Sequence, residues 1–261
     1  MIIVTGSNGF IGKNLVESLD GSLFLVDKDD KEAVFNIDWA TVTHVYHMGA
    51  ISDTTEKDVD LIYRNNIDYS IRLFEKAIQN KTPVTYASSA SVYGTSQLDH
   101  INPLNYYAMS KATLDLWVAD NIDRFELIRG YRFFNVYGKH EDHKGSQASP
   151  VYQFTRQARE NGTIKVFENT QGIGDGERDF IWVGDVVRVM TTDTRPSGIY
   201  NLGTGKTMRF SELAKLIAQK YNAAIEEIPF PKHLVGKYQY YTCAYPATPN
   251  CISVEDYIND L

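Results

Sequence analysis

Three polar side chains in the middle of the chain have the types and spacing of a proton-transfer site. Tyr107 and Lys111 are four residues apart in a stretch with helical periodicity, so both side chains emerge on one helix face. A nearby ammonium group stabilises a phenolate and moves the pKa of a tyrosine down from about 10 towards the working range. Ser89, which follows the apolar run ending at Ala87, can hydrogen-bond the same substrate oxygen. We expect the three to remove a hydroxyl proton while hydride leaves the same carbon for a nicotinamide.

A glycine-rich turn near the start of the chain is typical of a phosphate-binding loop. It contains Gly6, Asn8, Gly9, Phe10, Ile11 and Gly12, directly after an apolar run and at the start of a helical pattern. Glycines at this spacing allow a tight turn, a close approach to a pyrophosphate and close helix–strand packing. The turn therefore predicts a bound dinucleotide.

Asp27 ends the second apolar run, about 20 residues after the first glycine, where a carboxylate would meet the ribose hydroxyls of the dinucleotide. A carboxylate repels a 2′-phosphate and favours NAD, but the adjacent Lys28 offsets that charge. These two residues leave the choice between NAD and NADP open.

The elements that must position these residues follow an alternating pattern. Short β-branched or apolar runs at 2–5, 23–26, 34–37, 44–47, 84–87 and 127–131 predict strands, and helical periodicity covers 10–19, 59–78 and 106–121. Such alternation is typical of an α/β fold with a doubly wound, Rossmann-type parallel sheet.

The pattern changes near residue 140. A charged, glycine-containing loop precedes a predicted helix at 151–160, strands at 165–167 and 179–183, and a helix capped by Ser211. We predict an NAD(P)-binding domain over residues 1–140, with contributions from about 178–200, and a smaller substrate-binding lobe over 141–261.

Composition limits the function classes. The 261 residues are 43% hydrophobic and 23% charged, and a net charge of −7 argues against a nucleic-acid partner. No run approaches the roughly 20 apolar residues of a membrane span, and two cysteines give no disulfide framework. His140 and His143 lie in a charged loop and predict no metal site. We expect a cytoplasmic protein that binds neither membrane nor metal.

Several motifs extend the pattern along the chain: His47–Ala50 with Thr54–Glu56, Tyr86–Ala90, Pro103–Asn105, Phe134–Gly138, His143–Ser146 with Ala148 and Ser149, Arg178–Phe180, and Ile228–Pro231 with Tyr241 and Thr242. With the glycine turn and the Tyr107–Lys111 pair, they resemble the extended short-chain dehydrogenases. Within that group the chain is most similar to the ADP-L-glycero-D-manno-heptose 6-epimerase family.

The resemblance implies a nucleotide-sugar epimerase, an isomerase that acts by transient oxidation to a ketone, with tightly bound NADP and a homo-oligomeric state. It implies Lys144 as a second acid/base, which suits inversion because hydride must return to the opposite face. It assigns further cofactor contacts to Met48, Gly49, Ala50, Asn65 and Val136, and nucleotide-sugar contacts to Ser89, Asn135, Ser146, Phe167, Glu168, Arg178 and Tyr241.

Alternatives stay open at this point. The segment Gly172–Glu177 is more similar to other nucleotide-sugar epimerases, so a UDP-, GDP- or dTDP-hexose 4-epimerase is the second hypothesis. A dehydratase needs an acidic residue beside the catalytic serine, where this chain has Ala90 and Ser91. A non-catalytic, dinucleotide-binding regulatory protein is the third hypothesis, and the complete set of Ser89, Tyr107 and Lys111 argues against it.

Overall fold

The computed structural model describes residues 1–96, 100–169, 174–232 and 239–261. Gly172 and Ile173 of the glycine-rich segment lie outside these ranges. The helices are α1 Phe10–Ser18, α2 Val59–Ile62, α3 Tyr69–Gln79, α4 Tyr106–Asn121, α5 Pro150–Asn161, α6 Val183–Thr192, α7 Phe210–Tyr221 and α8 Val254–Asp260. The strands are β1 Ile2–Thr5, β2 Leu23–Val26, β3 His44–His47, β4 Val84–Ser89, β5 Ile128–Phe133, β6 Asn135–Tyr137, β7 Thr163–Phe167, β8 Glu177–Trp182, β9 Gly198–Leu202, β10 Thr207–Arg209, β11 Ala224–Ile228 and β12 Tyr241–Thr242.

The chain divides into two compact units. The first unit comprises residues 1–92, 105–132 and 187–200, and the second unit comprises 93–104, 133–186 and 201–261. Each unit is therefore built from segments that are far apart in the sequence.

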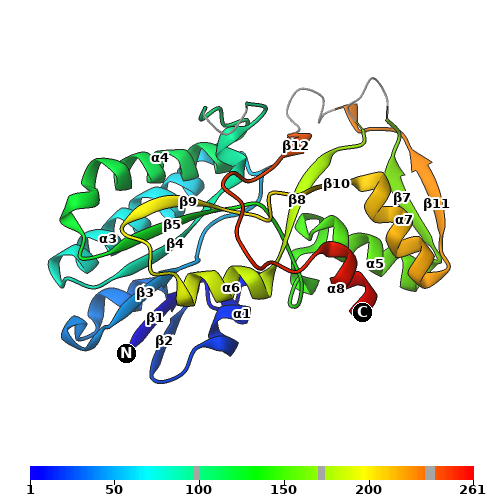
Figure 1. Ribbon diagram of the computed structural model, residues 1–261. Coiled ribbons are helices and arrows are strands. Elements are labelled where there is room, and N and C mark those ends of the chain that lie inside the picture. Colours follow the sequence, from blue (N-terminus) through cyan, green and yellow to red (C-terminus); the bar gives the residue numbers. More distant parts are fainter. Residues whose placement is uncertain (97–99, 170–173, 233–238) are drawn as a thin grey trace. The chain divides into compact units, whose positions relative to one another are not determined.

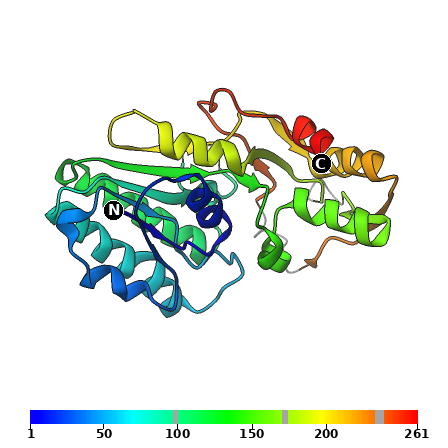
Figure 2. The ribbon, with the colours of Figure 1, turned by 90° about the horizontal axis from the view of Figure 1, so that it is seen from below.

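The core of the first unit is a sheet with strand order β2-β1-β3-β4-β5-β9. β1 pairs in parallel with β2 and β3, and β3 pairs in parallel with β4. Helix α1 covers one face of the sheet, and α3 and α4 cover the other (Figures 1 and 2). This arrangement confirms the predicted doubly wound α/β class.

One predicted strand of this unit is wrong. Within the described part of the chain, residues 34–37 pair with no strand; instead Lys31–Asn36 forms a short 3₁₀ helix. Val34 is fully buried, and the ring of Phe35 packs edge-on against Tyr69 with ring centroids 5.8 Å apart. A 3₁₀ turn buries both side chains without requiring a strand partner, so burial rather than pairing explains the β-branched composition.

The helices of the first unit form where local signals predict them. Asn105 caps α4 by accepting a hydrogen bond from the Ala108 N–H at 2.9 Å, which explains why the helix begins at Tyr106. The periodic stretch from Val59 to Gln79 is interrupted by a π-helical turn over Tyr63–Asp68. Such turns are rare in proteins, and those that occur are often found at functional sites.

The second unit combines small sheets with the packed helices α5, α7 and α8. β8 pairs with β6 and β12 in parallel and with β10 antiparallel, and β7 pairs in parallel with β11. Helices α5 and α7 pack beside β7, and their apolar faces form the core with Leu213, Ile217 and Phe154 (Figure 1).

The predicted cap of α7 is also wrong. The helix begins at Phe210 with Arg209 as its N-cap, earlier than expected. Ser211 instead contacts the segment before β8, because its N–H and hydroxyl both donate to the Asp175 carboxylate at 2.9 and 2.8 Å.

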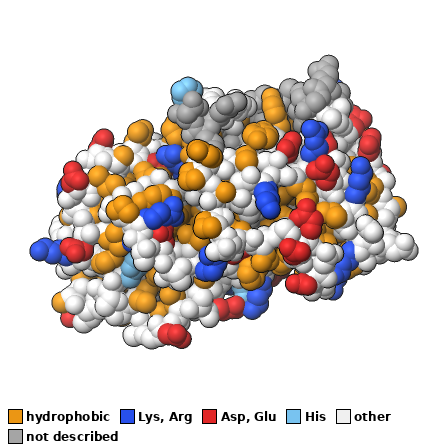
Figure 3. All heavy atoms as spheres, in the orientation of Figure 1, with side chains coloured by type: hydrophobic (Ala, Val, Ile, Leu, Met, Phe, Trp, Pro, Cys, Tyr) orange, Lys and Arg blue, Asp and Glu red, His pale blue; other side chains and the backbone are white. Residues whose placement is uncertain are grey.

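On the face drawn in Figure 3, Lys and Arg side chains are interspersed with Asp and Glu side chains. Among the described helices, none is long and apolar enough to cross a membrane.

Candidate active site

The glycine turn of the first unit forms a tight cradle between β1 and α1. Gly6 has a φ of +64°, and a Cβ there would lie 2.6 Å from the backbone of Gly49. A Cβ on Gly12 would lie 2.0 Å from the Gly6 carbonyl oxygen, which is shorter than the contact distance of two non-bonded heavy atoms. Both positions therefore require glycine, the first for its conformation and the second for the space it leaves.

The N-terminus of α1 can accept an anion. Gly9 is its N-cap and offers no side-chain hydrogen bond, and the first turn holds no acidic residue. N–H groups and the positive end of the helix dipole are thus available to phosphate oxygens. The cradle fits the pyrophosphate of a dinucleotide, and Asn8, Phe10 and Ile11 lie in the same turn.

Asp27 follows β2 and holds the glycine turn. One carboxylate oxygen accepts a hydrogen bond from the Asn8 N–H at 2.8 Å, and the other accepts from the Lys28 N–H at 2.8 Å. The neighbouring Lys28 is exposed. Asp27 and Lys28 therefore adjoin the cradle at the position that the sequence predicts for the adenosine ribose.

The loop after β3 lies against the same turn. Thr5 of β1 accepts hydrogen bonds from the Met48 N–H at its carbonyl and from the Gly49 N–H at its hydroxyl, at 3.2 and 3.1 Å. Met48, Gly49 and Ala50 are half-buried. The structure thus brings these three predicted cofactor residues to the cradle.

His47, at the end of β3, connects β1 to α3 through both of its ring nitrogens. Its Nδ1 lies 2.7 Å from the Thr5 hydroxyl and its Nε2 lies 2.7 Å from the Ser70 hydroxyl, which itself donates to the Asn66 carbonyl. Burial lowers the pKa of His47 to about 3, with a smaller contribution from the Lys111 charge. His47 is therefore a neutral structural bridge and not a base.

The π-helical turn carries two asparagines. Asn65, a predicted cofactor residue, accepts a hydrogen bond from the Lys31 ammonium at 2.5 Å. Its neighbour Asn66 is 1% exposed, bonds the backbone N–H and carbonyl of Ile51, and donates to the Ser110 hydroxyl at 3.0 Å. Asn66 therefore joins the loop after β3 to α4, a role that the sequence analysis missed.

Ser89, Tyr107 and Lys111 come together at the end of β4 and the first turns of α4. The Lys111 ammonium donates to the Ala87 carbonyl at 2.7 Å and lies 6.0 Å from the centroid of the Tyr107 ring. The Ser89 hydroxyl lowers the pKa of the Tyr107 phenol as a hydrogen-bonding neighbour. The predicted proton-transfer group is thus assembled within the first unit.

Burial dominates the protonation of this group. It raises the pKa of Tyr107, against the hydrogen bond with Ser89, which lowers it. Burial also lowers the pKa of Lys111 to about 8, against the negative charge of Asp115. The expected lowering of the tyrosine pKa is therefore outweighed here by loss of solvent around the phenol, while the Lys111 ammonium remains mostly charged at pH 7.

In the second unit, β8 gathers three predicted substrate residues. β6 pairs with β8 through Asn135 opposite Phe180, and β12 pairs with β8 through Tyr241 opposite Glu177. Arg178 is 5% exposed, and its guanidinium carbon lies 5.6 Å from the Phe210 ring. Asn135, Arg178 and Tyr241 are thus carried by three paired strands, and β6 also carries Val136.

Asp179 holds the loops around this sheet. Its buried carboxylate accepts hydrogen bonds from the Thr204 N–H and hydroxyl, from the Gly205 N–H and from the Ala244 N–H, at 2.7 to 2.9 Å. Burial raises its pKa and these donors lower it. Asp179 directly follows Arg178, and this adjacency was the one sequence signal for its role.

Lys144 and Ser146 lie on a 3₁₀ segment, Asp142–Gln147, that is kinked at Gly145. Lys144 is half-buried, and burial lowers its pKa against the charge of Glu141. Glu141 is 1% exposed and accepts from the Gly138 N–H and from both the N–H and hydroxyl of Ser149, which fixes the loop. Glu141 is another buried polar residue that the sequence analysis missed.

Phe167 and Glu168 lie at the end of β7, in the two-stranded sheet with β11. The Phe167 ring packs edge-on against Phe230 with centroids 5.4 Å apart, and the Glu168 N–H donates to the Ile228 carbonyl at 2.8 Å. The structure therefore places this pair in a different sheet from Asn135 and Arg178.

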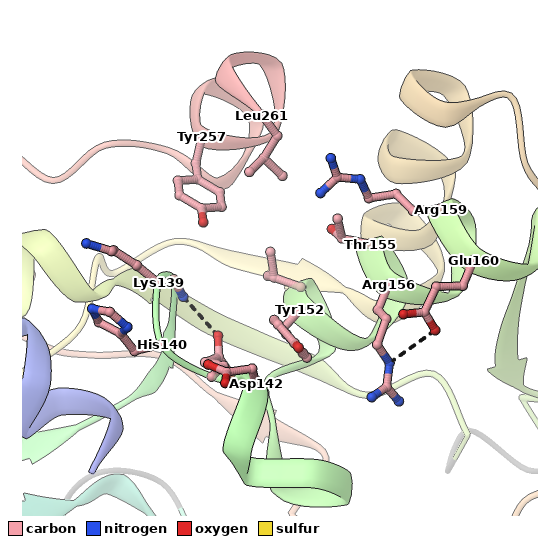
Figure 4. A pocket seen from close by; sticks show the side chains of 13 residues that line it. Lys139, His140, Asp142, Tyr152, Thr155, Arg156, Arg159, Glu160, Tyr257 and Leu261 are labelled. Carbon is pink, nitrogen blue, oxygen red and sulfur yellow. Dashed lines mark hydrogen bonds and ion pairs between the residues drawn. The ribbon is translucent and has the colours of Figure 1, made fainter. Parts of the chain in front are cut away.

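A hollow of about 460 Å³ lies on the second unit between the loop after β6, α5 and α8 (Figure 4). None of the predicted site residues lines it. Among its lining charges, Arg156 lies 4.0 Å from Glu160, and Glu141 is occupied by its three donors. Within the described ranges, no group of three His, Cys, Asp or Glu side chains is arranged to hold a metal ion.

Comparison with known proteins agrees with the resemblance predicted from the residues. Residues 2–203 match the NAD dependent epimerase/dehydratase family. An ADP-L-glycero-D-manno-heptose-6-epimerase of Alkalilimnicola ehrlichii is 40% identical over 94% of this chain and 88% of its own length.

Solved structures give the same result for the fold. The ADP-L-glycero-D-manno-heptose-6-epimerase of Helicobacter pylori matches with a TM-score of 0.82 and 25% identity, over 99% of this chain and 94% of its own. The UDP-glucose 4-epimerase of Thermus thermophilus, solved with NAD, matches with a TM-score of 0.80 and 22% identity, over 98% and 96% of the two chains, which shows the fold alone. The chain belongs to the NAD dependent epimerase/dehydratase family.

Proposed function

We propose that the protein is a nucleotide-sugar epimerase that inverts one sugar carbon through a transient ketone, with ADP-glycero-manno-heptose, inverted at C6, as its substrate. The observation that carries the reaction type is the assembly of Ser89, Tyr107 and Lys111 in the unit that also holds the glycine cradle. The sugar is inferred from the 40% identical relative.

The roles follow from the geometry. A bound nicotinamide supplies the hydride acceptor and donor. Tyr107 takes the proton of the sugar hydroxyl and returns it, and Ser89 holds the same oxygen through its hydroxyl. Lys111 contributes a positive charge, because a pKa of about 8 keeps most of its ammonium protonated at pH 7.

Lys144 is the proposed second acid/base. Its half-buried position and lowered pKa increase the fraction of neutral amine near pH 7, which a base requires. Inversion needs proton transfer in two geometries, since hydride returns to the opposite face of the ketone. Lys144 and Tyr107 would then each act in one of the two half-reactions.

We assign dinucleotide binding to the first unit and nucleotide-sugar binding to the second. In the second unit, Arg178 supplies a guanidinium that can bind a diphosphate through two hydrogen bonds. Asn135, Ser146, Phe167, Glu168 and Tyr241 would contact the remainder of the nucleotide-sugar.

The cofactor is proposed to be NADP. Both oxygens of the Asp27 carboxylate are engaged by backbone N–H groups, which reduces its repulsion of a 2′-phosphate, and Lys28 beside it is exposed and cationic. Mass spectrometry of the nucleotide released on denaturing the purified protein tests this. NADP supports the proposal, whereas NAD alone contradicts it.

A homo-oligomer in the cytoplasm is the proposed state. Met109 and Leu116 of α4 are 49% and 62% exposed, and Val59 and Tyr63 near α2 are 50% and 56% exposed. Apolar side chains gathered on neighbouring helices are typical of an interface. The cytoplasm is proposed because both cysteines are thiols, the form that a reducing compartment maintains. Light scattering would detect the oligomer, and a monomer at micromolar concentration would refute it.

The function is tested with pure protein and either C6 epimer of ADP-glycero-manno-heptose, followed by proton NMR. We expect the same mixture of epimers from both directions. Substrate deuterated at C6 should keep its deuterium in water, because the hydride returns to the carbon it left. Loss of deuterium to solvent would refute transient oxidation.

The same assay separates the alternatives. Conversion of UDP-glucose to UDP-galactose without turnover of the heptose would favour a 4-epimerase. Cofactor binding without turnover of any nucleotide-sugar would favour the regulatory role.

A further inference from the structure

Asp115 is a buried carboxylate on the helix that carries Tyr107 and Lys111. The three residues follow one another at intervals of four, so they share one face of α4. Asp115 is 2% exposed. A carboxylate is rarely buried unless it is paired, so its partners indicate its purpose.

The partners of Asp115 lie on two strands of the sheet. Its Oδ1 accepts a hydrogen bond from the Tyr86 hydroxyl at 2.9 Å, and its Oδ2 accepts from the Ser88 hydroxyl at 2.9 Å and the Arg132 Nε at 2.8 Å. Tyr86 and Ser88 are alternate residues of β4 and thus point to one face of the sheet. The carboxylate therefore fastens α4 to β4.

β4 is also the strand that the proton-transfer group contacts. The Ala87 carbonyl of β4 accepts the hydrogen bond of the Lys111 ammonium, and Ser89 at its end lowers the pKa of Tyr107 as a hydrogen-bonding neighbour. Fastening α4 to β4 at Asp115 thus fixes the spacing between the two elements that hold the reacting groups. A shift of the helix along the strand would change both contacts together.

The charge of Asp115 acts on the same two groups. It stabilises the Lys111 ammonium, raising the pKa of Lys111 against burial, and it disfavours the Tyr107 phenolate, raising the pKa of Tyr107. Among the described residues, the other charged or titratable groups facing this cluster are Tyr86 from β4, Arg132 from β5 and His47 from β3, and burial keeps His47 neutral.

We infer that Asp115 is a positioning residue for the Tyr107–Lys111 pair, which it both fastens to β4 and tunes through its charge. The inference deepens the proposed function and rests on it. Two consequences follow from its two actions: removing the charge should alter the pH dependence of turnover, and removing a fastening hydrogen bond should alter the rate alone.

Asp115→Asn tests the charge. Without it, the ammonium is less stabilised and the phenolate is less disfavoured, so both limbs of the pH profile of kcat should move to lower pH, by roughly half a unit or more. A purely structural carboxylate would lower kcat and leave both limbs in place. Unmoved limbs therefore overturn the electrostatic part of the inference.

Asp193→Asn is the matched control. Asp193 also accepts from a tyrosine hydroxyl, Tyr131 at 2.6 Å, and pairs with an arginine, Arg195 at 2.7 Å, but it directly follows α6 and is not part of α4. We expect this variant to lose stability and to keep the wild-type limbs. Equal movement of the limbs in both variants would show a general effect of lost stability and overturn the inference.

Ser88→Ala tests the fastening and keeps the charge, so it remains decisive should Asp115→Asn not fold. We expect kcat to fall roughly 3- to 10-fold, with the KM for nucleotide-sugar and the pH limbs unchanged, because one of three hydrogen bonds is lost. A wild-type kcat would overturn the fastening role.

A measurement without substrate separates this inference from the proposed function. In protein labelled with ¹³Cζ-tyrosine, the resonance of Tyr107 is identified by its loss in Tyr107→Phe. Its titration should occur at lower pH in Asp115→Asn than in wild type, and an unchanged titration overturns the inference. Absence of epimerisation by the wild-type protein, by contrast, refutes the proposed function alone.

Discussion

Acidification from pH 7 to pH 5 is expected to destabilise the first unit, because His47 stays neutral when the protein is folded. Burial lowers its pKa to about 3, whereas an unfolded chain has a histidine pKa of about 6.5. Below 6.5 the unfolded state therefore binds a proton that the folded state does not. The stabilisation is fully present above pH 6.5 and is lost progressively as the pH falls towards 3.

The magnitude follows from one proton per histidine. At pH 5, about 1.5 units below the unfolded pKa, the unfolded chain is favoured by about 2 kcal/mol for each such group. His44, whose pKa burial lowers to about 4, contributes a similar amount. The two together predict a loss of about 4 kcal/mol in the free energy of unfolding between pH 7 and pH 5.

His47→Asn isolates the contribution of the buried ring. The variant loses hydrogen bonds to Thr5 and Ser70 at every pH, so the comparison is between slopes. Urea unfolding followed by tryptophan fluorescence at pH 7, 6 and 5 should show a loss of about 2 kcal/mol in the variant and about 4 kcal/mol in the wild type.

His143→Asn serves as the control, because His143 is exposed and its replacement removes a histidine without altering a buried one. We expect it to retain the wild-type slope. Parallel slopes for wild type and His47→Asn would refute the reasoning, since they would mean that His47 binds protons equally in the folded and unfolded states.

Three further substitutions test the site. Gly12→Ala should weaken cofactor binding at least tenfold in a fluorescence titration with NADPH, because its Cβ would lie 2.0 Å from the Gly6 carbonyl oxygen; unchanged affinity would contradict the cradle. Asp179→Asn should lower the free energy of unfolding by about 2–4 kcal/mol, since an amide cannot accept all four donors, and an unchanged melting temperature would show the network to be dispensable. Tyr107→Phe should reduce kcat by roughly 10²- to 10⁴-fold with cofactor affinity retained, and preserved turnover would assign the base to another residue.

Local signals in the sequence account for much of the first unit. The helix at 106–121 was predicted to the residue, because apolar residues recur through it at intervals of three and four. The glycine turn was predicted because its requirement is backbone geometry, and only glycine satisfies it at Gly6 and Gly12. Such features are short-range, so residue types and spacing are sufficient to identify them.

The strand prediction at residues 34–37 was wrong, because a buried apolar segment has the same composition as a paired strand. Residues 34–37 are as apolar as a strand, yet Val34 and Phe35 reach the core from a 3₁₀ turn. Whether an apolar run pairs or merely packs depends on which neighbour is available at the sheet edge. The tertiary structure decides which neighbour is available, so the residues of the segment do not reveal it.

The sequence alone determined the residue types of the chemistry: a phenol, an ammonium and a hydroxyl, with a glycine turn for phosphate. Only the tertiary structure decided that Asp115 and Asn66 are buried polar groups that hold parts of the first unit together, and that Asp179 and Glu141 fix loops of the second unit. Asp115, Asn66 and Asp179 bond partners from distant segments, and the free energy of burying a polar group depends on partners that spacing along the chain does not reveal.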